Sequence, residues 1–182
     1  MRGIISLIIF SLILITAPSC SHHANKWAKY TGDRNFTVIL PGTPVVRDVQ
    51  EITPFGKQTV HYVTWKPATL DLNKFKLVQI SYTDCPARFT SDSGKQNVAL
   101  DSSINMRKRD FTDNEIISQP VDINGDRGRA FFYDPPKDNL ITIVKQVIAN
   151  HKRYDITVIA KKNYPINEEI GNFFNSFKVL RN

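Results

Sequence analysis

The feature that most limits the fold of this chain is a series of runs in which apolar and polar residues alternate, separated by short turn signals. Alternation with a period of two is typical of strands that bury one face. Strands are therefore predicted over Phe36–Leu40, Thr59–Lys66, Phe75–Asp84, Glu115–Ile123, Arg127–Tyr133, Leu140–Ala149 and Arg153–Ala160, with Val45–Ile52 as a further candidate.

The connections between these runs are of hairpin length. Asn124-Gly125 lies between two runs and is the strongest short signal for a two-residue hairpin turn. Asn150-His151 occupies the same place between the next two runs. Because short connections join antiparallel neighbours, a mostly antiparallel sheet is predicted. Leu140–Ala149 is apolar on both faces, which indicates a central position in that sheet.

Two segments show the helical period instead. Between Ser91 and Phe111 one apolar stripe lies among polar residues, as in a helix with one side in water. The closing helix has a full apolar stripe, made of Ile166, Ile170, Phe173, Phe174 and Phe177. We expect this stripe to be buried against the sheet, and a partner-binding surface is the alternative. The predicted fold class is therefore α+β: about six or seven mostly antiparallel strands with two main helices packed on the sheet.

The amino terminus has the order of a secretory signal. Arg2 precedes an apolar run, Ile4–Ile15, and small residues follow. As a helix the run would measure about 18 Å, too short to span a bilayer. Ala17-Pro18-Ser19-Cys20 resembles the lipobox of bacterial lipoproteins, although Pro18 is unusual there. This resemblance implies that Cys20 receives a diacylglycerol and that the signal is removed before it. The alternative is ordinary cleavage near Ala17, which would yield a soluble product.

The expected organisation is a signal peptide over residues 1–19, a lipidated tether over 20–26 and one domain over 27–182. His22-His23 falls in the tether without a third metal ligand nearby, so we predict no metal site. Ser21 follows the cysteine, and an Asp in that place is the usual signal for retention in the inner membrane of enterobacteria. Its absence favours the periplasmic face of the outer membrane, if the organism is Gram-negative.

Charge and cysteine content limit the partners. The formal net charge of +7 is spread over the chain, and no nucleic-acid-binding motif accompanies it. We therefore expect no nucleic-acid partner and a basic surface lying close to anionic lipid. The chain has two cysteines, and lipidation of Cys20 would leave Cys85 unpaired, so no disulfide is expected.

A second resemblance concerns the domain itself. Phe36–Pro44 is similar to the opening "strand, then Pro-Gly-x-Pro" of PsbP-like domains. Gly125 and Gly128 in the middle hairpin, the strand start Arg153-Tyr154, and Phe174 with Phe177 in the closing helix follow in the same order. The resemblance covers residues 30–180. It implies an antiparallel sheet with helices packed around it, and a family of mostly accessory or scaffold proteins that carries no catalytic motif.

Few residues form a pattern typical of a catalytic or ligand-binding site. Cys85 is the one candidate nucleophile, with His61 or His151 as its base, but Asp84 beside it would disfavour a thiolate. A packed structural thiol is the preferred interpretation. Asn124–Gly128 is superficially similar to a phosphate-binding loop, and Asp122, Asn124 and Asp126 to a calcium loop, yet strands flank both. The carboxylates Asp33, Asp134 and Asp155 show no pairing in the sequence.

The sequence is compatible with three functions. The preferred one is a membrane-anchored exported lipoprotein with a non-catalytic binding or scaffolding domain, no cofactor and an unknown partner. The alternatives are a carrier of a small apolar ligand and, less favoured, a hydrolase built on Cys85.

Overall fold

The computed structural model describes residues 27–33, 35–67, 75–110, 117–134, 139–162 and 168–181. In this part of the chain the strands are β1 (Ala28–Gly32), β2 (Phe36–Leu40), β3 (Val45–Thr53), β4 (Gly56–Trp65), β5 (Phe75–Asp84), β6 (Ile117–Ile123), β7 (Asp126–Tyr133), β8 (Leu140–Ala149), β9 (Lys152–Lys161) and β10 (Lys178–Val179). The helices are α1 (Ala87–Thr90), α2 (Ser93–Asp110) and α3 (Glu168–Ser176). The predicted signal peptide, Cys20, the tether, Phe111 and Ile166 lie outside the described residues.

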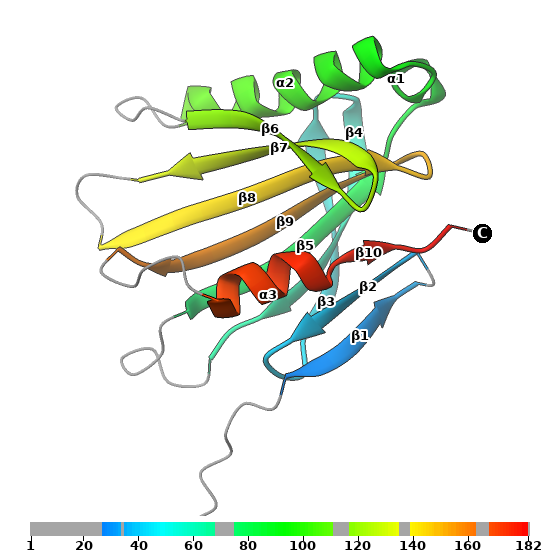
Figure 1. Cartoon of the computed structure of the whole chain (residues 1–182). Coiled ribbons are helices and arrows are strands. Elements are labelled where there is room, and N and C mark those ends of the chain that lie inside the picture. The colour runs from blue at the N-terminus through cyan, green and yellow to red at the C-terminus, as the bar shows by residue number, and fades with distance from the viewer. Residues whose placement is uncertain are drawn as a thin grey trace, which may run out of the picture.

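Most of the strands form a seven-stranded antiparallel sheet with the order β3-β4-β5-β9-β8-β7-β6 (Figure 1). The alternating runs predicted these seven strands, including the candidate over Val45–Ile52, with ends that differ by up to three residues. β8 lies between β7 and β9, so the prediction of a central position is confirmed. The central strands are the most apolar because side chains on both of their faces are covered.

A second sheet was not predicted. β1, β2 and β10 form a separate three-stranded antiparallel sheet, which includes the predicted strand Phe36–Leu40. β10 has two residues, and β1 has three exposed residues among its five, so neither carries a clear alternating pattern. Their extended conformation depends on pairing with β2, which the local sequence does not encode.

Four aromatic rings join the two sheets. Phe36 of β2 packs on Tyr82 of β5, Tyr154 of β9 and Phe177, with ring centroids 5.6, 5.9 and 5.5 Å apart. Phe36, Tyr154 and Phe177 are completely buried. We call Phe36, Tyr82, Tyr154 and Phe177 the aromatic cluster. It holds the small sheet against one face of the large sheet.

The two long helices cover opposite faces of the large sheet. α3 lies on the same face as the small sheet and buries Ile170, Phe173 and Phe174 in the main core, so the prediction of a packed closing helix is confirmed. α2 crosses the other face near β7 and β8, where its Leu100 and Ile104 are buried (Figure 1). Alternate residues of β8 supply the two cores, which explains why that strand is apolar throughout.

Both predicted hairpin turns form. Asn124, Gly125, Asn150 and His151 all have positive φ angles, as a two-residue type I′ turn requires. The two asparagine amides also donate to the C-terminal segment, Asn124 to the Phe177 carbonyl at 2.5 Å and Asn150 to the Leu180 carbonyl at 2.6 Å. The turn residues therefore fix the end of the chain as well as the register of the strands.

A buried polar cluster lies between α2 and the large sheet. Its members are Ser103 of α2, Gln146 of β8 and the β9 residues Arg153 and Asp155, all less than a tenth exposed. Gln146 donates to Asp155 at 2.9 Å and to Ser103 at 3.0 Å, and Arg153 donates to Ser103 at 3.1 Å. Arg153 Nε lies 3.4 Å from Asp155 Oδ1, so the guanidinium is balanced by one buried carboxylate.

None of the described helices is long and apolar enough to cross a membrane.

Candidate functional site

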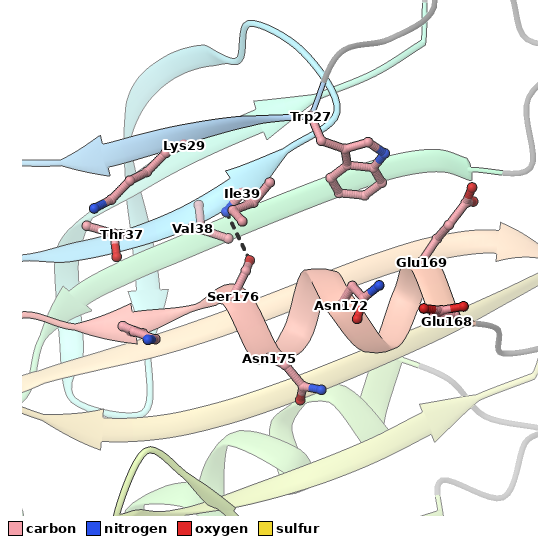
Figure 2. A pocket seen from close by; sticks show the side chains of 11 residues that line it. Trp27, Lys29, Thr37, Val38, Ile39, Glu168, Glu169, Asn172, Asn175 and Ser176 are labelled. Atoms are coloured by element: carbon pink, nitrogen blue, oxygen red, sulfur yellow. Dashed lines mark hydrogen bonds between the residues drawn. The ribbon is translucent and has the colours of Figure 1, made fainter.

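A groove of about 830 Å³ runs between α3 and the outer side of the small sheet (Figure 2). β1 and β2 contribute Lys29, Thr37, Val38 and Ile39, and Trp27 precedes β1. The remaining lining residues, from α3 and β10, are Glu168, Glu169, Asn172, Asn175, Ser176 and Lys178. The groove is open to solvent, and its wall is mostly apolar surface bordered by hydrogen-bonding side chains.

Packing fixes the walls of this groove. The Trp27 ring stands edge-on to Phe75 of β5, with centroids 6.2 Å apart, so it is held against the large sheet. Ser176 accepts the backbone N–H of Ile39 at 2.9 Å and donates to the Phe173 carbonyl at 2.7 Å. This serine therefore ties the last turn of α3 to β2 and sets the width of the groove. The dashed line in Figure 2 marks its bond to Ile39.

Opposite charges mark the two ends of the groove. Glu168 and Glu169 lie in the first turn of α3, near Trp27, while Lys29 lies towards the other end (Figure 2). Lys178 of β10 pairs with Thr37 of β2 and so belongs to the lysine end. Acidic residues in the first turn are favoured by the helix dipole, which gives the glutamates a structural role in addition to their place in the groove. An occupant that matches this surface carries positive charge at one end and negative charge at the other.

Cys85 lies in a different place and is packed. It is 3% exposed, in a small core with Ala99, Leu100 and Ile148 beneath α2. Burial raises the pKa of its thiol to about 11, and nearby Arg153 offsets only part of this effect. Catalysis by a cysteine requires the thiolate, and a buried thiol with a raised pKa is inert near neutral pH. The structure therefore supports the structural interpretation of Cys85.

The two histidines proposed as bases have other neighbours. His61 Nδ1 lies 2.8 Å from Asp48 Oδ1, and its ring stacks on Tyr82 at 4.7 Å. His151 Nδ1 lies 3.0 Å from the Thr90 hydroxyl. The contact between His151 and Cys85 is a backbone one, in which the Cys85 N–H donates to the His151 carbonyl at 2.7 Å. Neither imidazole is placed as a base for the thiol.

The carboxylates that the sequence left unpaired have separate partners. Asp33 accepts a hydrogen bond from Tyr82, Asp134 pairs with Lys162 at 2.6 Å, and Asp155 belongs to the buried polar cluster. The hairpin at Asn124–Gly128 is similarly occupied: Asp122 accepts the Gly125 N–H at 2.9 Å, and Asp126 pairs with Arg181 at 3.2 Å. Within the described residues, no three His, Cys, Asp or Glu side chains are grouped so that they could hold a metal ion.

Reasoning from the sequence did not identify the groove. Its lining comes from residues 27–39 and 168–178, which come together only through the small sheet and α3. The predicted domain begins at residue 27, but that boundary does not indicate a surface shared with the closing helix. Cys20 lies outside the described residues, and its lipidation stays a prediction.

The comparisons with known proteins bear on the fold. No protein-family model and no curated protein sequence matches the chain. Among solved structures, the solution structure of cyanobacterial PsbP (CyanoP) from Synechocystis sp. PCC 6803 is similar, with a TM-score of 0.58 and 11% sequence identity. The match covers 91% of this chain and 98% of that one. The PsbP-like fold implied by residues 30–180 is thus supported, and at this identity the likeness concerns the fold alone.

Proposed function

We propose that this protein is an exported lipoprotein, anchored through Cys20, whose PsbP-like domain binds an extended segment of an envelope protein in the groove between α3 and the small sheet. The observation that carries the proposal is the position of Trp27. It lines the groove and is seven residues after Cys20, a separation of at most about 25 Å when the chain is fully extended. A lipid on Cys20 would hold the groove close to the membrane surface.

The composition of the groove supports a polypeptide as its occupant. Eight of its eleven lining side chains are polar or charged, and the apolar ones are Trp27, Val38 and Ile39. Because the groove is open to solvent, a small apolar ligand there would stay partly in contact with water, whereas pockets for small molecules bury most of the ligand surface. An extended peptide brings its own N–H and C=O groups, which can pair with the amides of Asn172 and Asn175 along α3. This surface therefore favours protein binding over the carrier hypothesis.

The anchor is tested by Cys20→Ser. We expect this variant to lose incorporation of labelled fatty acid and to move from the membrane fraction to the soluble exported fraction. Two or more acyl chains hold a protein firmly on a bilayer, at about 0.8 kcal/mol per buried CH₂, whereas a basic surface alone binds weakly. The matched control is Ser21→Ala, which should remain acylated and membrane-bound. Unacylated wild-type protein in the soluble exported fraction would contradict the anchor.

The groove is tested by site-specific photo-crosslinking in cells that express the full chain. A photoreactive amino acid at Asn172 should capture a protein, and Glu168→Lys with Glu169→Lys should reduce the yield at least about fivefold by reversing one end of the charge pattern. The control position is Lys57, an exposed residue at the start of β4. Equal adducts at Asn172 and Lys57, or adducts at Asn172 with lipid alone, would rule out the groove as a protein-binding site.

A further inference from the structure

Strand β3 forms one edge of the large sheet and has unusual surface properties. It is nine residues long, and within the described residues β4 is the strand paired with it. Val45, Val46 and Ile52 are 69%, 55% and 79% exposed. Edge strands are usually protected against pairing by proline, by charged side chains (lysine above all) or by a short length. β3 contains neither proline nor lysine and is nine residues long, and its three charged residues, Arg47, Asp48 and Glu51, are of both signs.

From this edge we infer that two copies of the chain associate through β3. The two β3 strands pair antiparallel, with Val49 of one copy opposite Val49 of the other. The result is one continuous sheet of fourteen strands. A two-fold axis perpendicular to the sheet relates a strand to an antiparallel neighbour and keeps each side chain on its own face. The two copies would therefore extend the seven-stranded order β3-β4-β5-β9-β8-β7-β6 symmetrically from a shared centre. This association is independent of the groove and of the lipid anchor.

Backbone geometry limits the possible registers. In a strand, alternate residues direct their N–H and C=O groups to the free edge, and the same residues do so in the second copy. Antiparallel self-pairing must therefore place the axis on a residue and not between two residues. For the central part of β3 the axis could pass through Arg47, Asp48, Val49, Gln50 or Glu51.

The side chains distinguish these registers. An axis at Arg47, Asp48 or Glu51 places that charged residue opposite its own copy, and directly opposed like charges are unfavourable. An axis at Gln50 places Asp48 opposite Ile52. These four registers each set a charge against an unsuitable neighbour or against itself.

The axis at Val49 gives complementary pairs instead. Arg47 then lies opposite Glu51 of the second copy, Val46 opposite Ile52, and Val49 opposite itself. The ion pair and the apolar pair each occur twice because of the symmetry. Val46 and Ile52, both exposed apolar side chains in the single chain, would cover each other. Arg47 and Glu51 already lie on one face, beside Tyr62, whose ring is 5.0 Å from the guanidinium and whose hydroxyl donates to Glu51 at 2.6 Å.

Cysteine cross-linking in the full chain, extracted from membranes in detergent, tests the register. In the proposed pairing the two Val49 Cα atoms are about 4.5–5.5 Å apart, within the range that a disulfide spans. Val49→Cys should form a disulfide-linked dimer under mild oxidation. Ile52→Cys is the matched control. Position 52 is more exposed than position 49, but the residues at position 52 of the two chains would be about 20 Å apart. The unsubstituted chain reports any background from Cys20 or Cys85.

We expect Val49→Cys to cross-link at least about tenfold faster than Ile52→Cys, and a mixture of the Val46→Cys and Ile52→Cys proteins to form the mixed dimer. Equal rates for Val49→Cys and Ile52→Cys, or no dimer with Val49→Cys, would overturn the proposal. That result would leave the groove and the anchor unaffected.

Charge reversal provides a second measurement on the Val49→Cys background. Arg47→Glu or Glu51→Arg should each lower the cross-linking rate about tenfold, because each puts like charges opposite across the interface. The double change should restore the rate by exchanging the two charges. Circular dichroism melting would show that each variant is folded. Folded single variants that cross-link as fast as the parent would exclude this register.

Discussion

Replacing Phe177 with alanine is expected to lower the free energy of unfolding by about 3–5 kcal/mol. Phe177 is completely buried and packs on Phe36 and Tyr154, each with a ring-centroid distance of 5.5 Å. The substitution removes a large apolar side chain from the aromatic cluster and leaves a cavity where the small sheet, the large sheet and the end of α3 meet. A domain of this size has a total stability of about 5–15 kcal/mol, so the loss should be plain in a urea titration followed by circular dichroism.

Tyr154→Phe is the matched control for this prediction. Its hydroxyl is buried and has no hydrogen-bond partner among the described residues, and burial raises its pKa to about 12. Removing that hydroxyl keeps the ring in the aromatic cluster, so the stability should be unchanged or slightly higher. If Phe177→Ala were as stable as Tyr154→Phe, the rings would not be responsible for joining the two sheets.

The second large effect is expected at Asp155. Asp155→Ala removes the carboxylate that balances Arg153 beneath α2, and breaking a buried ion pair from one side typically lowers stability by about 3–5 kcal/mol. Gln146 also loses the acceptor of its 2.9 Å hydrogen bond. Arg153 would keep its hydrogen bond to Ser103 and its contact with the Phe55 ring, 5.6 Å away. Neither contact supplies the negative charge that Asp155 provides. The measurement is again the denaturant midpoint of the full chain in detergent.

A surface pair on the same face provides the comparison. Asp101 of α2 pairs with Arg129 of β7 at 3.1 Å, but its side chain is 53% exposed. Asp101→Ala should lower the stability by less than about 1 kcal/mol because solvent screens exposed pairs. The double variant Arg153→Met with Asp155→Leu should recover part of the loss, since it removes both buried charges. Equal effects at Asp101 and Asp155 would show that the buried cluster is hydrated.

The local elements follow directly from patterns in the amino-acid sequence. Alternation defined the seven strands of the large sheet, and Asn124-Gly125 and Asn150-His151 marked two of its hairpins, which the positive φ angles confirm. The stripe through Ile170, Phe173 and Phe174 identified the closing helix and its buried face. These features could be read because side-chain periodicity and turn conformation depend on residues only a few positions apart.

Which of these elements pair, and what surfaces they form, depends on long-range packing. The hydrogen bond from the Ile39 N–H to the Ser176 hydroxyl joins residues 137 positions apart, and it closes one side of the groove. No local sequence pattern predicts that groove. β1 and β10 become strands because β2 and the aromatic cluster hold them. Asp155 is an ordinary polar residue in the alternating pattern of β9, and it becomes a buried counter-ion because α2 covers that part of the sheet. Contacts at such separations depend on how whole faces pack, and that information is distributed over the chain.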